Sequence, residues 1–203
     1  VTNVMYRQKG FANLQEGSLP LTAWGSAELG EVLHAKENGG CNRDDSVLFR
    51  HIPPLTPAVL QDSVAGEYEV IAIPAVHGTR EPYNYIVRSC REDKALLYAH
   101  DTSIYEQQST WDYMTEQGIH LDLVSLDCTF ANDPRDFLRG HMNFILVRRM
   151  RDRLLELGVA DERTVFGANH FSHNGANVLY EEMCQPSVSD GMVISYDGLE
   201  IEF

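Results

Sequence analysis

The sequence lacks several features that would point to particular classes of protein. It contains no apolar run of the length that a membrane-spanning helix needs, and no signal-peptide pattern opens it. We therefore expect no membrane partner, and a cytoplasmic location is the simplest interpretation. Its four cysteines are widely scattered without a Cys-x-x-Cys pair, which argues against a zinc knuckle or a disulfide framework.

Basic residues are also scarce. The 203 residues include 16 Lys and Arg against 30 Asp and Glu, which gives a formal net charge of −14. Proteins that bind a phosphate backbone usually present a basic face, so this charge disfavours nucleic acid as a partner. The hydrophobic share of 43% is ordinary for a globular protein. A chain of this length can bury one core, and we expect a single domain over residues 1–203.

Three predicted strands each end near residues that can bind a metal ion. These strands lie near residues 67–76, 94–100 and 163–168, and the residues that follow them are His77, Asp101, His170 and His173. Imidazole nitrogens and carboxylate oxygens are common zinc ligands, although histidines near a turn are more often hydrogen-bonded loop residues. Ligands that converge from separate strand ends onto one edge present a metal to a substrate. The pattern therefore favours a metal site.

The rest of the chain alternates between helices and strands. The sequence pattern predicts a short helix capped by Ser26, strands at 47–52, 84–89 and 121–128, helices near 105–117, 141–157 and 175–184, and a final hairpin over 190–203. The prolines of residues 53–57 are expected to end a strand. Four arginines in the helix near 141–157, Arg148, Arg149, Arg151 and Arg153, are most simply a solvated face. Periodicity alone supports a mixed α/β fold.

Taken together, these motifs resemble the metallo-β-lactamase superfamily of metal-dependent hydrolases over nearly the whole chain. In detail they look like its branch of phosphonate-pathway cyclic phosphodiesterases. In that superfamily a histidine matched by His77 binds one metal, and an aspartate in a strand-Asp-Thr motif, matched by Asp101, bridges two. A Thr-His-x-Ser-His motif is matched by Asn169-His-Phe-Ser-His173, whose His170 would bind the second metal. The resemblance implies a four-layer αββα sandwich of the α/β (α+β) class.

The resemblance also implies a reaction. A small-molecule phosphodiester or related ester would be hydrolysed by hydroxide held between two divalent ions, and both zinc and manganese suit such ligands. In the phosphodiesterase branch a histidine at the position of His141 lies over the metals and protonates the leaving group. His173 would bind substrate or orient His170, whereas Asp127 would buttress the site or merely form a turn. Many members pair as dimers, so the resemblance allows a homodimer.

One departure from the superfamily leaves alternatives open. Its defining His-x-His-x-Asp-His loop is absent, because no two of the eight histidines are separated by a single residue. Members carry that loop and a first layer of strands before the region that Val1 to Trp24 resembles, so we expect the C-terminal portion of such a domain, with part of its metal site. A tRNA 3′-processing nuclease and a lactone or thioester hydrolase are alternatives within the fold. Outside enzymes, a metal-free scaffold or interaction domain is the alternative.

Overall fold

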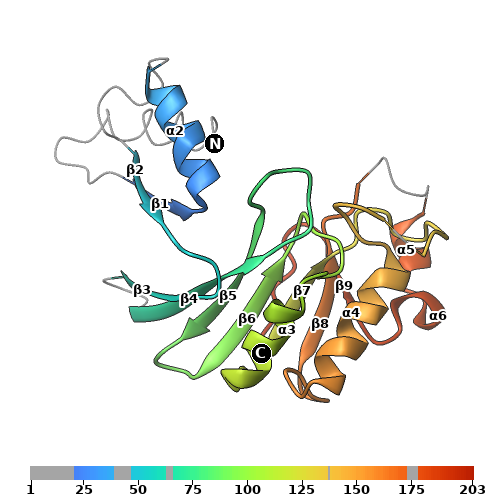
Figure 1. The fold of residues 1–203 in the computed structure, drawn as a ribbon. Helices are drawn as coiled ribbons and strands as arrows, with labels where there is room; N and C mark the ends of the chain where they lie inside the picture. The colour runs from blue at the N-terminus through green and yellow to red at the C-terminus, as the bar shows by residue number, and fades with distance from the viewer. Residues whose placement is uncertain (1–20, 39–46, 63–65, 137, 173–177) are drawn as a thin grey trace. The chain divides into compact units, whose positions relative to one another are not determined.

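The computed structural model describes residues 21–38, 47–62, 66–136, 138–172 and 178–203 (Figure 1). The chain divides into two compact units, Val1–Pro54 and Leu55–Phe203. Within the described residues, no helix combines the length and the apolar character that crossing a membrane requires. The expectation of one domain over the whole chain stays a prediction.

The first unit is built from two strands and one helix. Strand β1 (Leu21–Gly25) pairs in parallel with β2 (Val47–His51), and helix α2 (Ala27–Asn38) follows β1. The predicted cap of α2 is confirmed, because the backbone N–H of Leu29 donates to Ser26 Oγ at 3.3 Å. A Cβ on Gly30 would lie 2.6 Å from the ring of Phe49, so glycine is needed where α2 packs on β2.

The second unit contains a seven-stranded sheet in which the strands follow one another in chain order. Its members are β3 (Pro57–Asp62), β4 (Gly66–Pro74), β5 (Tyr83–Ser89), β6 (Lys94–Ala99), β7 (Leu123–Asp127), β8 (Val165–Asn169) and β9 (Val193–Ile194). Pairing is antiparallel from β3 to β6 and parallel from β6 to β9. The parallel pairs need crossover connections, and two of these are helices.

Helices α3 (Gln108–Glu116) and α4 (Phe144–Glu156) are these crossovers and lie on the same face of the sheet (Figure 1). Leu97 and Leu126 of the sheet and Met114, Met150 and Leu154 of the two helices are fully buried in one core. Two short helices, α5 (Tyr180–Met183) and α6 (Pro186–Ser189), precede β9. The predicted mixed α/β fold is confirmed, and the helices and this sheet supply two layers of the expected sandwich.

Several details differ from the sequence predictions. Strand β3 was not predicted, because residues 53–57 contain three prolines. The final hairpin is wrong in part: Leu199 N–H donates to Tyr196 O in the expected turn, but residues 195–203 form no second strand. Helix α4 begins at Phe144, after the extended N-cap Asn143, so His141 precedes the helix. The helix expected near 175–184 lies partly outside the described residues.

The arginines of α4 do more than face solvent. Arg151 donates to the carbonyl oxygen of Asp190 and to its carboxylate, each at 2.9 Å, and its side chain is only 19% exposed. Arg148 donates to Val188 O, and Arg149 donates to Asp136 O. These bonds attach α6 and the loop before α4 to the helix. The expectation of a merely solvated face is therefore wrong for Arg148 and Arg151, whereas Arg149 is exposed as expected.

Cys128 behaves as a structural residue. It is fully buried at the end of β7, and burial, with a smaller contribution from Asp127, raises the pKa of its thiol. Cys90 and Cys184 are free and exposed, as the scattered cysteine pattern predicted.

Candidate metal centre

Four strands of the second unit deliver chemically active residues to the same edge of the sheet. Strands β4 and β6 each pair antiparallel with β5 and so run in the same direction, and β7 and β8 continue it in parallel. Their carboxyl ends therefore share one edge, the usual place for a ligand site in such sheets. His77 follows β4, Asp101 follows β6, Asp127 ends β7 and His170 follows β8.

Two of the three predicted metal ligands converge on a carboxylate oxygen of the third. Nε2 of His77 and Nε2 of His170 each lie 3.5 Å from Asp101 Oδ1. Two atoms bound to one zinc ion at about 2.0–2.1 Å and tetrahedral angles lie roughly 3.4 Å apart, so these separations suit ligands of a shared ion. The Asp101 side chain is 58% exposed and can be reached from solvent. The donor atoms that lie within 4.8 Å of one another and could hold a divalent ion belong to Asp101, Asp127, His141 and His170. His77 is not in that set and approaches it through Asp101 Oδ1. The roles of these residues remain a prediction.

Two of these residues have a backbone conformation that residues other than glycine rarely adopt. The φ angles of Asp101 and His170 are +51° and +62°, in the left-handed region. Such conformations cost energy in residues other than glycine and are concentrated at functional sites. Asn169 offsets the cost at His170, since its Oδ1 accepts from the backbone N–H of His170 and from Ser195 Oγ, each at 2.7 Å. Both strands thus turn sharply as they deliver their ligands.

His141 is held by a buried carboxylate. Asp127 is fully buried; its Oδ1 accepts from the backbone N–H groups of Thr129 at 2.9 Å and Met142 at 3.1 Å, and its Oδ2 lies 2.8 Å from His141 Nδ1. When Nδ1–H donates to Asp127, Nε2 of His141 faces the metal ligands and lies 3.4 Å from Nε2 of His77.

Asp127 also lies within 4.8 Å of donor atoms of Asp101, His141 and His170, as a ligand would. Both of its oxygens are already engaged in hydrogen bonds, however, and it has no exposed surface. We therefore assign Asp127 to the support of His141 rather than to the metal. Both functions considered from the sequence fit this geometry, because Asp127 contacts His141 and also accepts from the N–H of Thr129 in the turn that follows β7.

Thr129 was missed by sequence reasoning. Its hydroxyl donates to the carbonyl oxygen of His170 at 3.0 Å and lies 2.8 Å from His170 Nδ1. Because the hydroxyl proton is used, the oxygen accepts from Nδ1–H, which leaves the lone pair of His170 on Nε2, the atom that faces Asp101. The position of Thr129 two residues after the end of β7 was the available signal.

The loop before α4 contacts His77. Gly140 has a φ of +81°, and a Cβ there would lie 3.5 Å from Cδ2 of His77. His77 and His141 rings meet edge to face, with centroids 4.9 Å apart. The predicted ligand and the predicted acid therefore come from two loops in direct contact. His173, the other predicted catalytic residue, lies outside the described residues.

His100 lies beside this centre without joining it. Burial lowers its pKa to about 4, and the nearby His170 ring contributes to the shift. Its Nε2 lies 2.8 Å from Ser125 Oγ. The ring is therefore neutral near pH 7 and serves as a hydrogen-bonded wall of the site.

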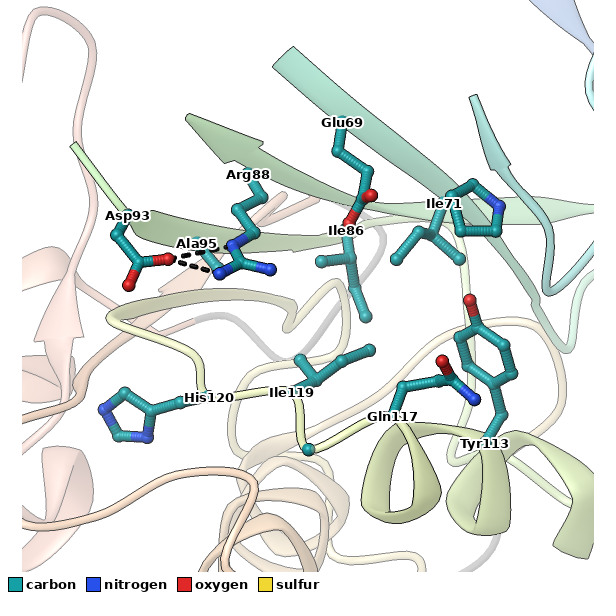
Figure 2. A pocket seen from close by; sticks show the side chains of 12 residues that line it. Glu69, Ile71, Ile86, Arg88, Asp93, Ala95, Tyr113, Gln117, Ile119 and His120 are labelled. Carbon is teal, nitrogen blue, oxygen red and sulfur yellow. Dashed lines mark hydrogen bonds and ion pairs between the residues drawn. The ribbon is translucent and has the colours of Figure 1, made fainter. Parts of the chain in front are cut away.

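Of the cavities along the described part of the second unit, two lie at different ends of the sheet. One, of about 490 Å³, adjoins His170 and is lined also by Phe171, Tyr196 and Leu199. The other, of about 370 Å³, lies between the C-terminal end of α3 and the sheet, where Tyr113 and Gln117 rise toward Glu69 (Figure 2). His170 lines the first cavity, whereas none of the proposed ligands lines the second.

Comparison with solved structures identifies the fold. The chain is similar to the metallo-β-lactamase fold protein YhfI from Bacillus subtilis, with a TM-score of 0.63 and 16% identity over 97% of this chain and 70% of that one. It is also similar to Zn²⁺-bound PqqB from Methylobacterium extorquens, with a TM-score of 0.60 and 13% identity over 96% and 69% of the two chains. A candidate metal-dependent hydrolase from Veillonella parvula matches with a TM-score of 0.55 and 10% identity over 89% and 66%.

These similarities show that the chain has the metallo-β-lactamase fold, as the sequence motifs implied. It covers about 70% of the length of the first two structures. No protein-family model and no curated protein matches the sequence. His77, Asp101 and His170, which carry part of the sequence resemblance, follow strands whose carboxyl ends share one edge of the sheet.

Proposed function

We propose that the protein is a metal-dependent hydrolase that acts on a small phosphodiester or related ester. The observation that carries this proposal is the convergence of His77 and His170 on one oxygen of Asp101, at the separations expected between ligands of one ion. The fold supports it, since the similar PqqB structure contains zinc and another similar structure is a candidate metal-dependent hydrolase.

Each residue has a distinct part in this proposal. His77, Asp101 and His170 would hold the divalent ions. When bound, such ions would polarise the ester and lower the pKa of an attacking water. His141 would donate the proton of its Nε2 to the leaving oxygen, while Asp127 stabilises the protonated ring through Nδ1. The cavity of about 490 Å³ beside His170 has room for a small substrate.

Substitution of Asp101 tests the proposal. In the full-length gene product, Asp101→Ala should remove bound zinc or manganese and abolish hydrolysis of a nitrophenyl phosphodiester, because the other two ligands converge on this carboxylate. Asp112→Ala is the matched control, since Asp112 is an exposed carboxylate of α3 whose described side-chain contact is with Gln108. Metal content is measured by elemental analysis. An Asp101→Ala protein that keeps its metal and its turnover would contradict the proposal.

A further inference from the structure

Three loops that carry the candidate metal centre meet at two consecutive buried residues. Thr102 is fully buried and Ser103 is 4% exposed, and both directly follow Asp101. Neither lies among the proposed ligands or proton donors. Their hydrogen bonds nevertheless reach the loop of His77 and the loop of His141.

The first bonds join the Asp101 turn to the His77 loop. The backbone N–H of Val76 donates to Thr102 Oγ1, and the backbone N–H of Ser103 donates to Val76 O, each at 3.0 Å. Both backbone polar groups of Val76 are therefore fixed by the residues after Asp101. Since Val76 immediately precedes His77, this pair of bonds sets the distance between the first two ligands.

A second bond reaches the third loop. Ser103 Oγ donates to Leu138 O at 2.6 Å, three residues before His141. On the other side of the turn, Asn84 Nδ2 donates to His100 O at 2.7 Å, and Asn84 Oδ1 accepts from the hydroxyl of Tyr105 at 3.0 Å. The left-handed backbone of Asp101 is thus held from both sides by buried groups.

We infer that Thr102 is a positioning residue for the metal centre, whose hydroxyl holds the His77 loop at the distance from Asp101 that a shared ion requires. This inference rests on the proposed function. The Thr102 hydroxyl acts as both acceptor and donor here, because it accepts from the Val76 N–H and donates its own proton to Ser103 O at 2.7 Å. Removal of the hydroxyl leaves the Val76 N–H without an acceptor and frees the loop to move.

The structure offers a control that separates this role from general stability. Thr164 Oγ1, at the other end of the parallel strands, accepts from the backbone N–H of Asp161 at 3.0 Å and donates to Leu121 O at 2.7 Å. Thr164 is also buried, at 9% exposure. It therefore has the same hydrogen-bond pattern as Thr102 without a link to the metal centre.

The experiment compares Thr102→Val, Thr102→Ser and Thr164→Val in the full-length gene product. Zn²⁺ alone is titrated in competition with a chromophoric chelator, and Co²⁺ spectra report the ligand geometry. Thermal melts of the metal-free proteins measure stability. Thr102→Val should weaken Zn²⁺ binding by about 10- to 100-fold, the usual effect of losing a group that orients a ligand. Thr102→Ser keeps the acceptor and should bind nearly as the wild type does, and Thr164→Val should lose stability without losing affinity.

The outcomes separate the inference from the proposed function. Equal Zn²⁺ affinity and equal Co²⁺ spectra in Thr102→Val and Thr164→Val would overturn the positioning role and leave the metal centre standing. A wild-type protein that binds neither ion would overturn both. If Thr102→Val does not fold, Thr102→Ala removes the same acceptor with a smaller side chain, and the same comparison with Thr102→Ser applies.

Discussion

The contact between Asp127 and His141 allows a quantitative prediction for the substitution Asp127→Asn. The asparagine Oδ1 can still accept from the backbone N–H groups of Thr129 and Met142, so the local fold should persist. Its amide nitrogen, however, replaces the oxygen that lies 2.8 Å from His141 Nδ1. The amide N–H of the asparagine and the Nδ1–H of His141 would then face each other as two donors. The neutral ring must therefore carry its proton on Nε2, and no carboxylate stabilises the protonated ring.

The magnitude follows from the bond that is lost. A hydrogen bond to a charged group contributes roughly 1.5–3 kcal/mol. If this contribution is present only when His141 is protonated to serve as the acid, its loss raises the barrier by the same amount. Since about 1.36 kcal/mol corresponds to a tenfold change in rate, kcat should fall about 10- to 150-fold. His141→Ala removes the acid itself and should cost roughly a hundredfold or more.

The assay uses two phosphodiesters that differ in their leaving group. An unsubstituted phenyl group needs a proton more than a nitrophenyl group does, so Asp127→Asn and His141→Ala should slow the phenyl diester more. Metal content should stay at the wild-type level in both variants, because neither removes a proposed ligand. Equal slowing of both diesters would refute the proton-donor role of His141. Loss of metal in Asp127→Asn would instead make Asp127 a ligand.

Two further predictions concern stability. Asn143 caps α4 by accepting from the Leu146 N–H at 3.0 Å, and its Nδ2 donates to the carbonyls of Asp133 and Arg135 at 2.8 and 2.6 Å. Asn143→Ala should therefore lower the free energy of unfolding, measured with urea, by about 2–4 kcal/mol. Asn143→Ser should lower it by about 1 kcal/mol less, since serine still caps the helix. Equal losses in the two variants would contradict the contribution of the cap. Because the pKa of His100 is lowered to about 4 in the folded protein, the unfolded chain binds a proton more readily below its ordinary pKa, near 6.5. The metal-free protein, prepared with a chelator, should lose stability as the pH falls from about 6.5 toward 4. The His100→Gln variant should lose less stability over this range. Parallel stability–pH profiles of the two proteins would contradict the lowered pKa of His100.

The strands that carry the candidate ligands were predictable because their signal is local. Strands β4, β6 and β8 are short apolar runs, and each is followed within three residues by His77, Asp101 or His170. Strand β3 has a weaker signal, because Pro57 is its first residue. A proline is tolerated there, since among the described strands β3 lies at the edge of the sheet, beside β4.

Other features depend on contacts that no local pattern records. The arginines of α4 looked like a solvated face, because nothing near them in sequence indicates that α6 packs alongside. Arg151 finds its partner at Asp190, 39 residues later in the chain. The second strand of the expected hairpin fails for a similar reason, since β9 is a short parallel partner of β8. The structure of this segment therefore depends on how β9 pairs in the sheet, and the turn at Tyr196 was not enough to predict a second strand.

The candidate metal centre shows the same division between local and distant information. Its proposed ligands were named from strand ends, but the groups that hold them were not, because these groups join residues far apart in sequence. Val76 and Thr102 are 26 residues apart, Asp127 and His141 are 14 apart, and Thr129 lies 41 residues from His170. A ligand can be recognised by its side-chain chemistry and its place in a strand, whereas a supporting residue acquires its role only from the neighbour that folding brings to it. Substitutions that alter metal affinity without touching a ligand should therefore be concentrated at such long-range, fully buried hydrogen bonds.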